Sequence, residues 1–577
     1  MSPTLFLIPL AALISPAPRF QTDTPDAAIM AKIREEGLKR SQLPQNLSYL
    51  TEVIGPRLTG SPGLLRANEY TKNKMIEWGL EAKLEPWGPF GRGWTCDKFA
   101  ATVVGPTSFN LIAAPRAWST GWSGTTEVVY VDADSPEALA KFKGRLKGKI
   151  ALISPTKELP AHFIAQGSRY TEEELAAMAS GALGGSGRPR PRDTSGAVPP
   201  VPPALPNASG TPSGPGRPRQ GGAGFGADLT EEQRAALQAR MRQAQMAGQI
   251  LAFCKAEGAV ATLSQARSGD GGTIFVEQAT VPQMPTARER EEARQPGAPR
   301  APRLTPYSVA AEKLMVPQIA VGAEHYNRIV RMVQAGEKVS VALDLKVRFN
   351  GDDKSMVNNT IGEWKGTDKA DEIVMAGGHL DSWHTGTGAT DNAAGVSVAM
   401  EAVRILKAIG VKPRRTIRVG LWSGEEQGIF GSTAYVKAHF GSPSAPGAEH
   451  AKFSSYFNLD NGTGKIRGVY CQGNTAIMPV FAEWLKPFAD LGATTVTARN
   501  TGGTDHLPFN SAGLPGFQFI QDTIEYDART HHSNMDTFDR IQLDDMKQAA
   551  TILAAFLYNA AMRDDKLPRK PTTPAGQ

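Results

Sequence analysis

Residues Gly378–Gly395 read GHLDSWHTGTGATDNAAG. His379 and Asp381 stand two residues apart after the apolar run 373–376, and Asp391 follows a Gly/Thr-rich loop at the start of a predicted helix. Residues two apart in an extended segment point the same way, so Asp381 can accept a hydrogen bond from one ring nitrogen of His379. Asp391 carries two carboxylate oxygens and can therefore bridge two cations.

Further candidate ligands lie downstream, each at or beyond the end of a predicted strand. They are Glu425 and Glu426 after 416–422, Asp460 after 453–459, and His532 in the loop after 517–520. Ligands of open α/β sheets bind beyond the carboxyl ends of strands, so we expect these side chains at one edge of one sheet. Carboxylates and imidazoles without thiolates are typical of a hydrolytic zinc site.

The adjacent carboxylates Glu425 and Glu426 are expected to have different roles. Neighbouring residues of an extended segment point to opposite sides, so the two are not expected to bind the same metal ion. One of them can bind a metal, while the other takes a proton from the attacking water as a general base.

Strand–helix alternation from residue 347 onward predicts an α/β fold, with a mixed, mostly parallel sheet sandwiched by helices. Apolar periodicity predicts helices over 27–85 and 392–409. Short β-branched runs predict a separate β-rich domain, at 126–131, 149–153, 315–320 and 339–343. We therefore expect a main domain in two segments, of which the first covers 27–119 and the second, with the site, covers 347–563. The inserted domain covers 120–346, and a flexible tail covers 564–577.

Two Pro/Gly- and Arg-rich segments, 181–228 and 286–303, interrupt the inserted domain and are expected to be disordered. The chain of 577 residues has a formal net charge of +6. Three segments carry an excess of basic residues. They hold five Arg against two Asp (181–228), five Arg against three Glu (283–303), and four basic against two acidic residues (561–577). The summed net charge of these three segments exceeds that of the whole chain. The remainder is about neutral, which argues against a nucleic-acid partner.

The N-terminal segment 1–20 is predicted to be a signal peptide. Its apolar run 5–14 has ten residues, too few to span a bilayer but enough for the core of a signal peptide. No other run is long enough for an integral membrane span, so we expect a soluble periplasmic or secreted protein. The three cysteines form no CxxC pair, which argues against zinc bound by thiolates. The sequence leaves the oligomeric state open, a homodimer included.

The candidate ligands, in this order along the chain, resemble the co-catalytic zinc exopeptidases of clan MH, family twenty-eight. The opening segment 50–62, LTEVIGPRLTGSP, is also similar to members of this family. Within it, the segments His531–Ser533 and Asp536–Thr537 look most like the plasma glutamate carboxypeptidase (carboxypeptidase Q) type. The resemblance implies the zinc exopeptidase fold, with the site motif at about 350–560 and a protease-associated (PA) domain at 120–346.

The resemblance also implies a role for each candidate residue and two Zn²⁺ ions per chain. One ion would be held by His379, Asp391 and Asp460, and the other by Asp391, Glu426 and His532. Glu425 would be the general base and Asp381 the partner of His379. The family further implies a cis peptide bond between Asp391 and Asn392.

Three more residues are candidates for contacts with the substrate or the oxyanion. Many relatives have Tyr in place of His531 and use it to stabilise the oxyanion, so here His531 or a backbone donor would take that role. Asp505 and His506 lie in GTDHLPF, 503–509, which resembles a segment that lines the substrate pocket.

These observations predict a metallo-exopeptidase, a hydrolase that removes one residue from a short peptide or splits a dipeptide. Aminopeptidase and dipeptidase action stay open, as does an activity of the glutamate carboxypeptidase type. A glutaminyl cyclase-like enzyme with a single zinc is disfavoured because both metal shells are complete. A non-catalytic binding protein on the same scaffold is disfavoured because every ligand and the general base are present.

Overall fold

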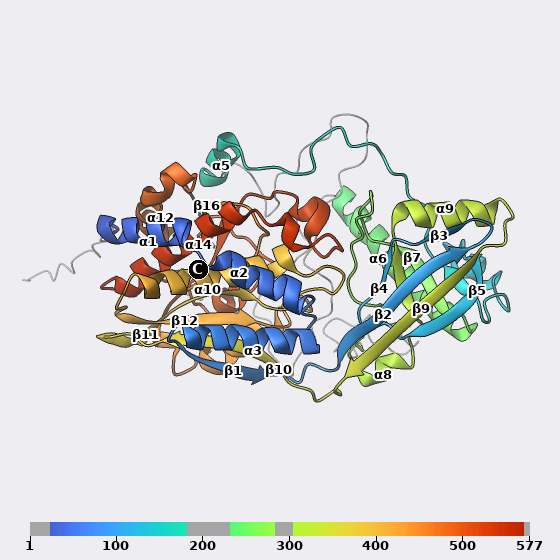
Figure 1. The fold of residues 1–577 in the computed structure, drawn as a ribbon, viewed down its shortest axis with the longest axis horizontal. Helices are drawn as coiled ribbons and strands as arrows, with labels where there is room; N and C mark the ends of the chain where they lie inside the picture. Colours follow the sequence, from blue (N-terminus) through green and yellow to red (C-terminus); the bar gives the residue numbers. More distant parts are fainter. Residues whose placement is uncertain (1–23, 182–230, 283–303, 571–577) are drawn as a thin grey trace, which may run out of the picture.

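The computed structural model describes residues 24–181, 231–282 and 304–570. The predicted signal peptide at 1–20 and the segment 286–303 lie outside the described residues, as does the segment 181–228 apart from Gly181. Figure 1 shows two bodies side by side, each built on an eight-stranded sheet. Within the described part of the chain, no helix combines the length and apolar character that a membrane span needs.

The first sheet is mixed, and four of its seven neighbouring pairs are parallel. Its order is β1 (Glu81–Trp87), β10 (Val357–Trp364), β12 (Arg415–Trp422), β11 (Lys369–His379), β15 (Phe453–Asn458), β18 (Gly516–Gln521), β16 (Ile466–Tyr470) and β17 (Thr495–Thr497). The four central strands β12, β11, β15 and β18 are parallel to one another. Their carboxyl ends therefore meet at the same edge of the sheet.

Helices cover both faces of this sheet, which explains why its central strands are continuously apolar. In β11, Val374 and Ala376 belong to the core under α1 (Ala27–Lys39), α10 (Ala394–Ala408) and α14 (Leu543–Met562). Ile373 and Met375 point to the opposite face, where they join the core under α11 (Phe430–His439) and α13 (His506–Ser511). This body also contains the helices α2 (Leu43–Ser48), α3 (Pro62–Glu77) and α12 (Met478–Leu485), and a small hairpin that pairs β13 (Gly441–Ser442) with β14 (Ala445–Pro446).

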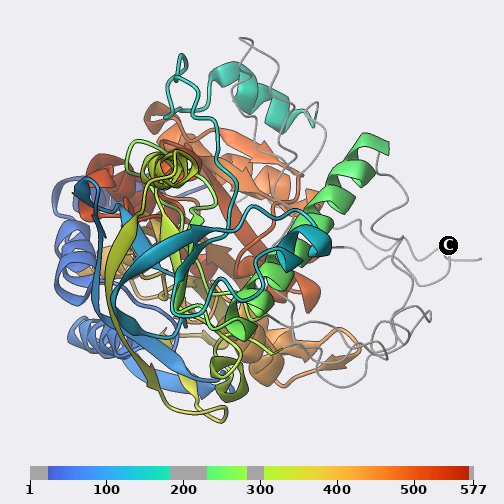
Figure 2. The same cartoon turned by 90° about the vertical axis from the view of Figure 1, so that its right-hand side faces the viewer.

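The second sheet has the order β3 (Ser108–Asn110), β2 (Gly93–Val104), β9 (Ser340–Asn350), β5 (Trp122–Tyr130), β6 (Ile150–Leu152), β7 (Ala261–Gln265), β8 (Gln318–Val321) and β4 (Ala113–Pro115). Its long strands β2 and β9 cross the front of Figure 2. Ile150 and Leu152 pack in the core that includes α9 (Ala323–Gln334), whereas Ala151 faces the core that includes α4 (Pro136–Ala140) and α6 (Glu231–Ala256). The short helix α8 (Val309–Glu312) precedes β8.

The two sheets divide the chain differently from the expected boundary between residues 119 and 120. Strands β2, β3 and β4 precede residue 120 but belong to the second sheet, because β2 pairs with β9 along Gly93–Val103. Conversely, α5 (Glu172–Ala179) lies within the expected insert but packs on the first sheet beside β17, where the Thr497 hydroxyl donates to the carbonyl of Met178. Domain limits drawn from composition miss such exchanges, and the division into domains itself stays a prediction.

Two local expectations differ from the structure. The helical prediction for 27–85 fails at its end, where β1 forms an edge strand. The flexible tail expected from residue 564 does not begin there, because Leu567 is buried and the carbonyl of Asp564 accepts hydrogen bonds from Lys369 and Arg415. These contacts hold residues 564–570 against the first sheet.

Candidate metal centre

The parallel strands of the first sheet bring the candidate ligands to one edge. His379 is the last residue of β11, Glu425 and Glu426 follow β12, and Asp460 follows β15 by two residues. His532 lies in the loop after β18, and Asp391 lies just before α10. The peptide bond between Asp391 and Asn392 is cis, as the family resemblance implied.

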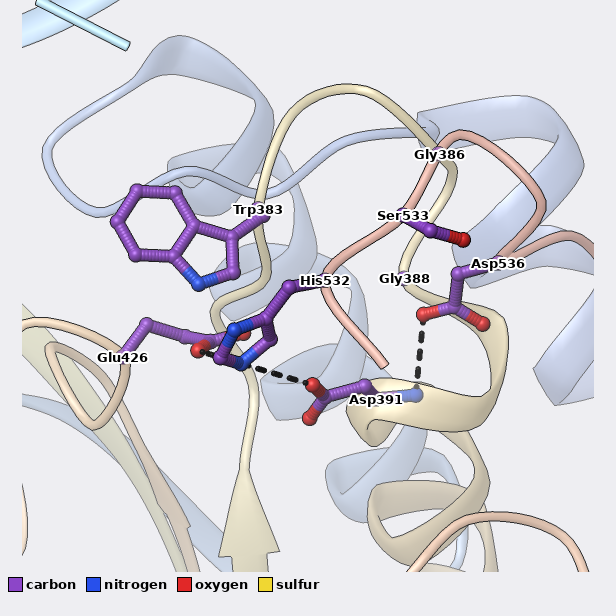
Figure 3. Close-up of a pocket in the computed structure, with 8 residues that line it drawn as sticks. All are labelled: Trp383, Gly386, Gly388, Asp391, Glu426, His532, Ser533 and Asp536. Carbon is purple, nitrogen blue, oxygen red and sulfur yellow. Dashed lines mark hydrogen bonds and ion pairs between the residues drawn. The ribbon is translucent and has the colours of Figure 1, made fainter. Parts of the chain in front are cut away.

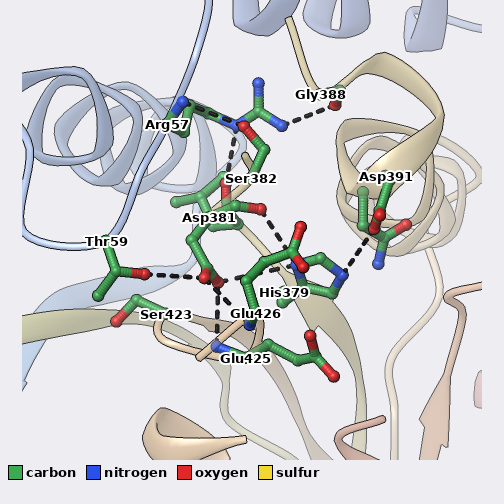
Figure 4. Close-up of polar contacts among 12 residues, drawn as sticks. Arg57, Thr59, His379, Asp381, Ser382, Gly388, Asp391, Ser423, Glu425 and Glu426 are labelled. Carbon is green, nitrogen blue, oxygen red and sulfur yellow. Dashed lines mark hydrogen bonds and ion pairs between the residues drawn. The ribbon is translucent and has the colours of Figure 1, made fainter. Parts of the chain in front are cut away.

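Asp391 lies between two imidazole rings and presents one carboxylate oxygen to each. Its Oδ1 is 3.2 Å from Nε2 of His379, and its Oδ2 is 3.3 Å from Nε2 of His532. Nε2 of His379 is also 3.4 Å from the carboxylate of Asp460, and Nε2 of His532 is 2.9 Å from that of Glu426. Figures 3 and 4 show the two sides of this arrangement. The geometry is that of two adjacent cation sites sharing Asp391.

The residues present fit metal ions because the cluster holds more negative charge than the protein itself compensates. In the described part of the chain, Oδ2 of Asp391 and Oε1 of Glu426 are buried and accept no hydrogen bond. Burial, and then the charge of Asp391, raise the pKa of Glu426 to about 8. Burial opposes ionisation of Asp391 as well, but the hydrogen bond with His379 and the nearby His532 and His531 lower its pKa. A bound cation would neutralise these carboxylates.

The carboxylate of Asp381 holds the loop that carries the two glutamates. It accepts hydrogen bonds from the Thr59 hydroxyl at 2.8 Å and from the backbone N–H groups of Glu425 and Glu426 at 3.3 and 3.4 Å (Figure 4). Nδ1 of His379 lies 3.0 Å from the backbone carbonyl of Asp381 and 3.7 Å from its carboxylate. The carbonyl is thus the closer partner of the ring, where the sequence predicted the carboxylate.

Glu425 stands beside the cluster without forming part of either ligand group. It is partly exposed, and it points to another side than Glu426 in Figure 4. Burial raises the pKa of Glu425 well above its ordinary value, the positive charge of His379 opposes the rise, and Asp460 and Asp505 add to it. A carboxyl group in this setting can exchange a proton with a substrate at the metal site.

The three candidate substrate residues lie at different places around the cluster. Nε2 of His531 is 3.8 Å from Asp391, and its ring stacks on Tyr526. Asp505 is fully buried and accepts a hydrogen bond of 2.5 Å from the Ser432 hydroxyl, and burial raises its pKa to about 7. The ring of His506 contacts the carbonyl of Thr501 and the amide of Gln472, which indicates a structural contact.

Comparison with known proteins identifies the region that carries the cluster. Residues 359–557 match the model of "Peptidase family M28". Over these residues the chain is similar to the peptidases of family M28. The match confirms the resemblance that the order of ligands had suggested.

Relatives of the M28 domain include carboxypeptidase Q of Mus musculus, which is 32% identical over 254 residues, or 44% of this chain and 52% of that protein. The chain thus spans about half the length of the curated relatives it matches. The crystal structure of a peptidase M28 precursor from Shewanella amazonensis aligns with a TM-score of 0.58 and 21% identity over 95% of this chain and 99% of that chain. A zinc aminopeptidase from Bacillus subtilis aligns at 0.51 and 18% identity over 91% and 96%. These likenesses confirm the mixed α/β fold.

Three residues around the metal centre had no predicted role there. Asp536 accepts backbone N–H bonds from Thr390 at 2.6 Å and Asp391 at 3.2 Å, and so positions the approach to α10 (Figure 3). Arg57 is fully buried and donates to carbonyls on both sides of the Gly/Thr loop (Figure 4). Glu277 reaches the site from the segment after β7 of the second sheet. The motif at 50–62 could have drawn attention to Arg57, whereas Glu277 follows no motif.

Proposed function

We propose that this protein is a zinc-dependent exopeptidase that hydrolyses short peptides or dipeptides. The observation that carries the proposal is the position of Asp391, whose two carboxylate oxygens face His379 on one side and His532 on the other. In this proposal His379, Asp391 and Asp460 hold one Zn²⁺, and Asp391, Glu426 and His532 hold a second. The match of residues 359–557 to the M28 family model and the likeness to a zinc aminopeptidase support the choice of metal.

Bound zinc would supply Lewis acidity, which polarises the scissile carbonyl and makes water a stronger acid. The protein's own groups perform the remaining steps. Glu425 takes a proton from the attacking water and returns it to the leaving amine, as general base and then general acid. Asp381 acts through its hydrogen bonds to the Glu425–Glu426 backbone, which fix the direction of both carboxylates. The side chain of His531 is partly exposed and lies 3.8 Å from Asp391, so it can donate to the developing oxyanion.

Substitution of Glu425 by Gln tests this function. We expect the variant to keep its zinc and lose at least about 100-fold in turnover, because a positioned general base contributes about 10²–10⁴-fold. Glu52→Gln, at an exposed glutamate, is the matched control and should leave turnover unchanged. Undiminished turnover by Glu425→Gln would remove Glu425 from the mechanism. Absence of turnover in the wild type with zinc bound would favour a binding protein instead.

The end of the peptide that is recognised is a separate question. The comparisons include both a carboxypeptidase and an aminopeptidase by name, so they favour neither. A panel of free, N-blocked and C-blocked dipeptides decides it: an aminopeptidase rejects the N-blocked members, a carboxypeptidase rejects the C-blocked members, and a strict dipeptidase rejects both.

Export to the periplasm or the medium is also part of the proposal, and it is supported by the apolar run at 5–14. N-terminal sequencing of the protein recovered from the periplasm or the medium tests it, and an uncleaved chain found only in the cytoplasm would contradict it. The homodimer stays a prediction that light scattering in solution tests.

A further inference from the structure

A segment of the second body, residues 274–279, runs directly beside the loop that carries His532; we call this segment the strap. The backbone N–H of Val276 donates to the carbonyl of His532 at 2.9 Å, and the backbone N–H of Asn534 donates to the carbonyl of Ile274 at 3.1 Å. Phe275 and Ser533 form the antiparallel bridge between these two bonds. The loop of His532 is therefore paired, residue by residue, with a segment that follows β7.

The same strap is fixed on its other side to the second sheet. The backbone N–H of Ala117 donates to the carbonyl of Glu277 at 3.1 Å, and that of Ala279 donates to the carbonyl of Ala117 at 2.8 Å. Ala117 follows β4, the edge strand of the second sheet. The strap thus has little freedom relative to either body, and its side chains have defined positions.

Glu277 is the residue of this strap whose side chain reaches the metal centre. Its Oε1 is 2.9 Å from Nδ1 of His532 and 3.0 Å from a guanidinium nitrogen of Arg267. The opposite ring nitrogen of His532, Nε2, faces Glu426 and Asp391. An imidazole that donates its Nδ1–H to a carboxylate keeps the lone pair of Nε2 directed at the metal side.

We propose that Glu277 is a positioning residue for His532, so that the second body sets the zinc affinity of one of the two sites in the first. Arg267 offsets the charge of Glu277 and keeps the carboxylate in place. The inference rests on the proposed function in one respect, namely that His532 binds zinc. It extends that function by making one site, the one with Glu426 and His532, depend on a residue outside the M28 match at 359–557.

Zinc binding by Glu277→Ala and Glu277→Gln tests the proposal without any assay of activity. Dissociation constants for the two sites are measured by competition with a chromogenic chelator, together with the melting temperature of the zinc-free protein. A carboxylate partner of a metal-binding histidine contributes about 10–100-fold to metal affinity, so Glu277→Ala should weaken one site by that factor and leave the other unchanged. Gln still offers an acceptor to Nδ1, so Glu277→Gln should recover part of the loss.

The matched control is Glu127→Gln, which removes another carboxylate of the second sheet, one paired at 2.7 Å with Lys149 away from the metal centre. It should bind both zinc ions like the wild type. Equal zinc affinity of wild type and Glu277→Ala at both sites would overturn the proposal. An equal loss of affinity at both sites, together with a lower melting temperature of the zinc-free protein, would also overturn it, because this combination indicates a merely structural role. If the wild type itself binds no zinc, the proposed function fails, and this inference fails with it.

Discussion

Arg57 offers a stringent test of how the metal centre is held. Its side chain is fully buried, and its guanidinium lies behind the Gly/Thr loop that leads from β11 to Asp391 (Figure 4). It donates hydrogen bonds to five backbone carbonyls, those of Leu50, Gly55, Leu380, Thr387 and Gly388. Burial lowers the pKa of Arg57 to about 10, and the surrounding carboxylates oppose the shift, so the group stays charged at neutral pH.

The cost of replacing Arg57 by Met follows from these bonds. Three of them, to Leu380, Thr387 and Gly388, are 2.7–2.8 Å long and lie at the two ends of the loop. A hydrogen bond to a charged group contributes about 1.5–3 kcal/mol, so the three together contribute roughly 4–9 kcal/mol. Release of the buried charge offsets several kcal/mol of that sum. We therefore expect Arg57→Met to reduce the free energy of unfolding by about 3–5 kcal/mol, as is typical when one partner of a buried charge network is removed.

Urea unfolding, followed by tryptophan fluorescence, measures this change. Arg66→Met is the control, since Arg66 is exposed and makes a single hydrogen bond of 3.3 Å, to the carbonyl of Val53, among the described residues. Its variant should unfold within about 0.5 kcal/mol of the wild type. If Arg57→Met were as stable as Arg66→Met, the loop would not depend on hydrogen bonds from the guanidinium, contrary to this prediction.

Two further predictions concern other parts of the first body. Hydrogen bonds from His439 to Glu449 and Glu85 raise the pKa of His439 to about 9. The stabilising contribution of His439 is therefore complete below the unfolded pKa of about 6.5 and is lost as the pH rises through 9. His439→Gln should lower the free energy of unfolding by about 1 kcal/mol at low pH, after allowance for solvent screening, and this difference should vanish by pH 10 in urea titrations. A difference that does not depend on pH would contradict the prediction. A Cβ at Gly395 would lie 2.1 Å from the carbonyl oxygen of Leu459, so Gly395→Ala should destabilise the folded protein by about 1–3 kcal/mol and weaken zinc binding. Gly502→Ala is the control, because a Cβ at Gly502 meets open space, and it should change neither quantity. Equal stability and equal zinc affinity of the two variants would contradict this prediction.

Much of the candidate site could be predicted because its residues follow strand ends. His379 ends an apolar strand and Glu426 and His532 follow two others, and parallel strands bring such positions together without any knowledge of side-chain packing. The role of Asp381 was only partly predictable. Alternation along an extended segment places it beside His379, but the structure directs its carboxylate to Thr59 and to the Glu425 backbone.

Contacts between the two bodies could not be predicted from the sequence. Glu277 lies in a segment without helical or strand periodicity, and its partner His532 is 255 residues away. The segment that forms β2 was expected in the first segment of the main domain, 27–119, and nothing in its composition indicates that it pairs with β9. Such pairings depend on the relative placement of whole elements, which local patterns do not encode.

The proposed sharing of Asp391 between two zinc ions can be tested by anomalous X-ray diffraction from crystals of the zinc-loaded protein, recorded on both sides of the zinc absorption edge. We expect two anomalous peaks about 3.5–4 Å apart, one beside His379 and Asp460 and the other beside Glu426 and His532, with a carboxylate oxygen of Asp391 on each. A single peak, or two peaks of which only one contacts Asp391, would contradict it.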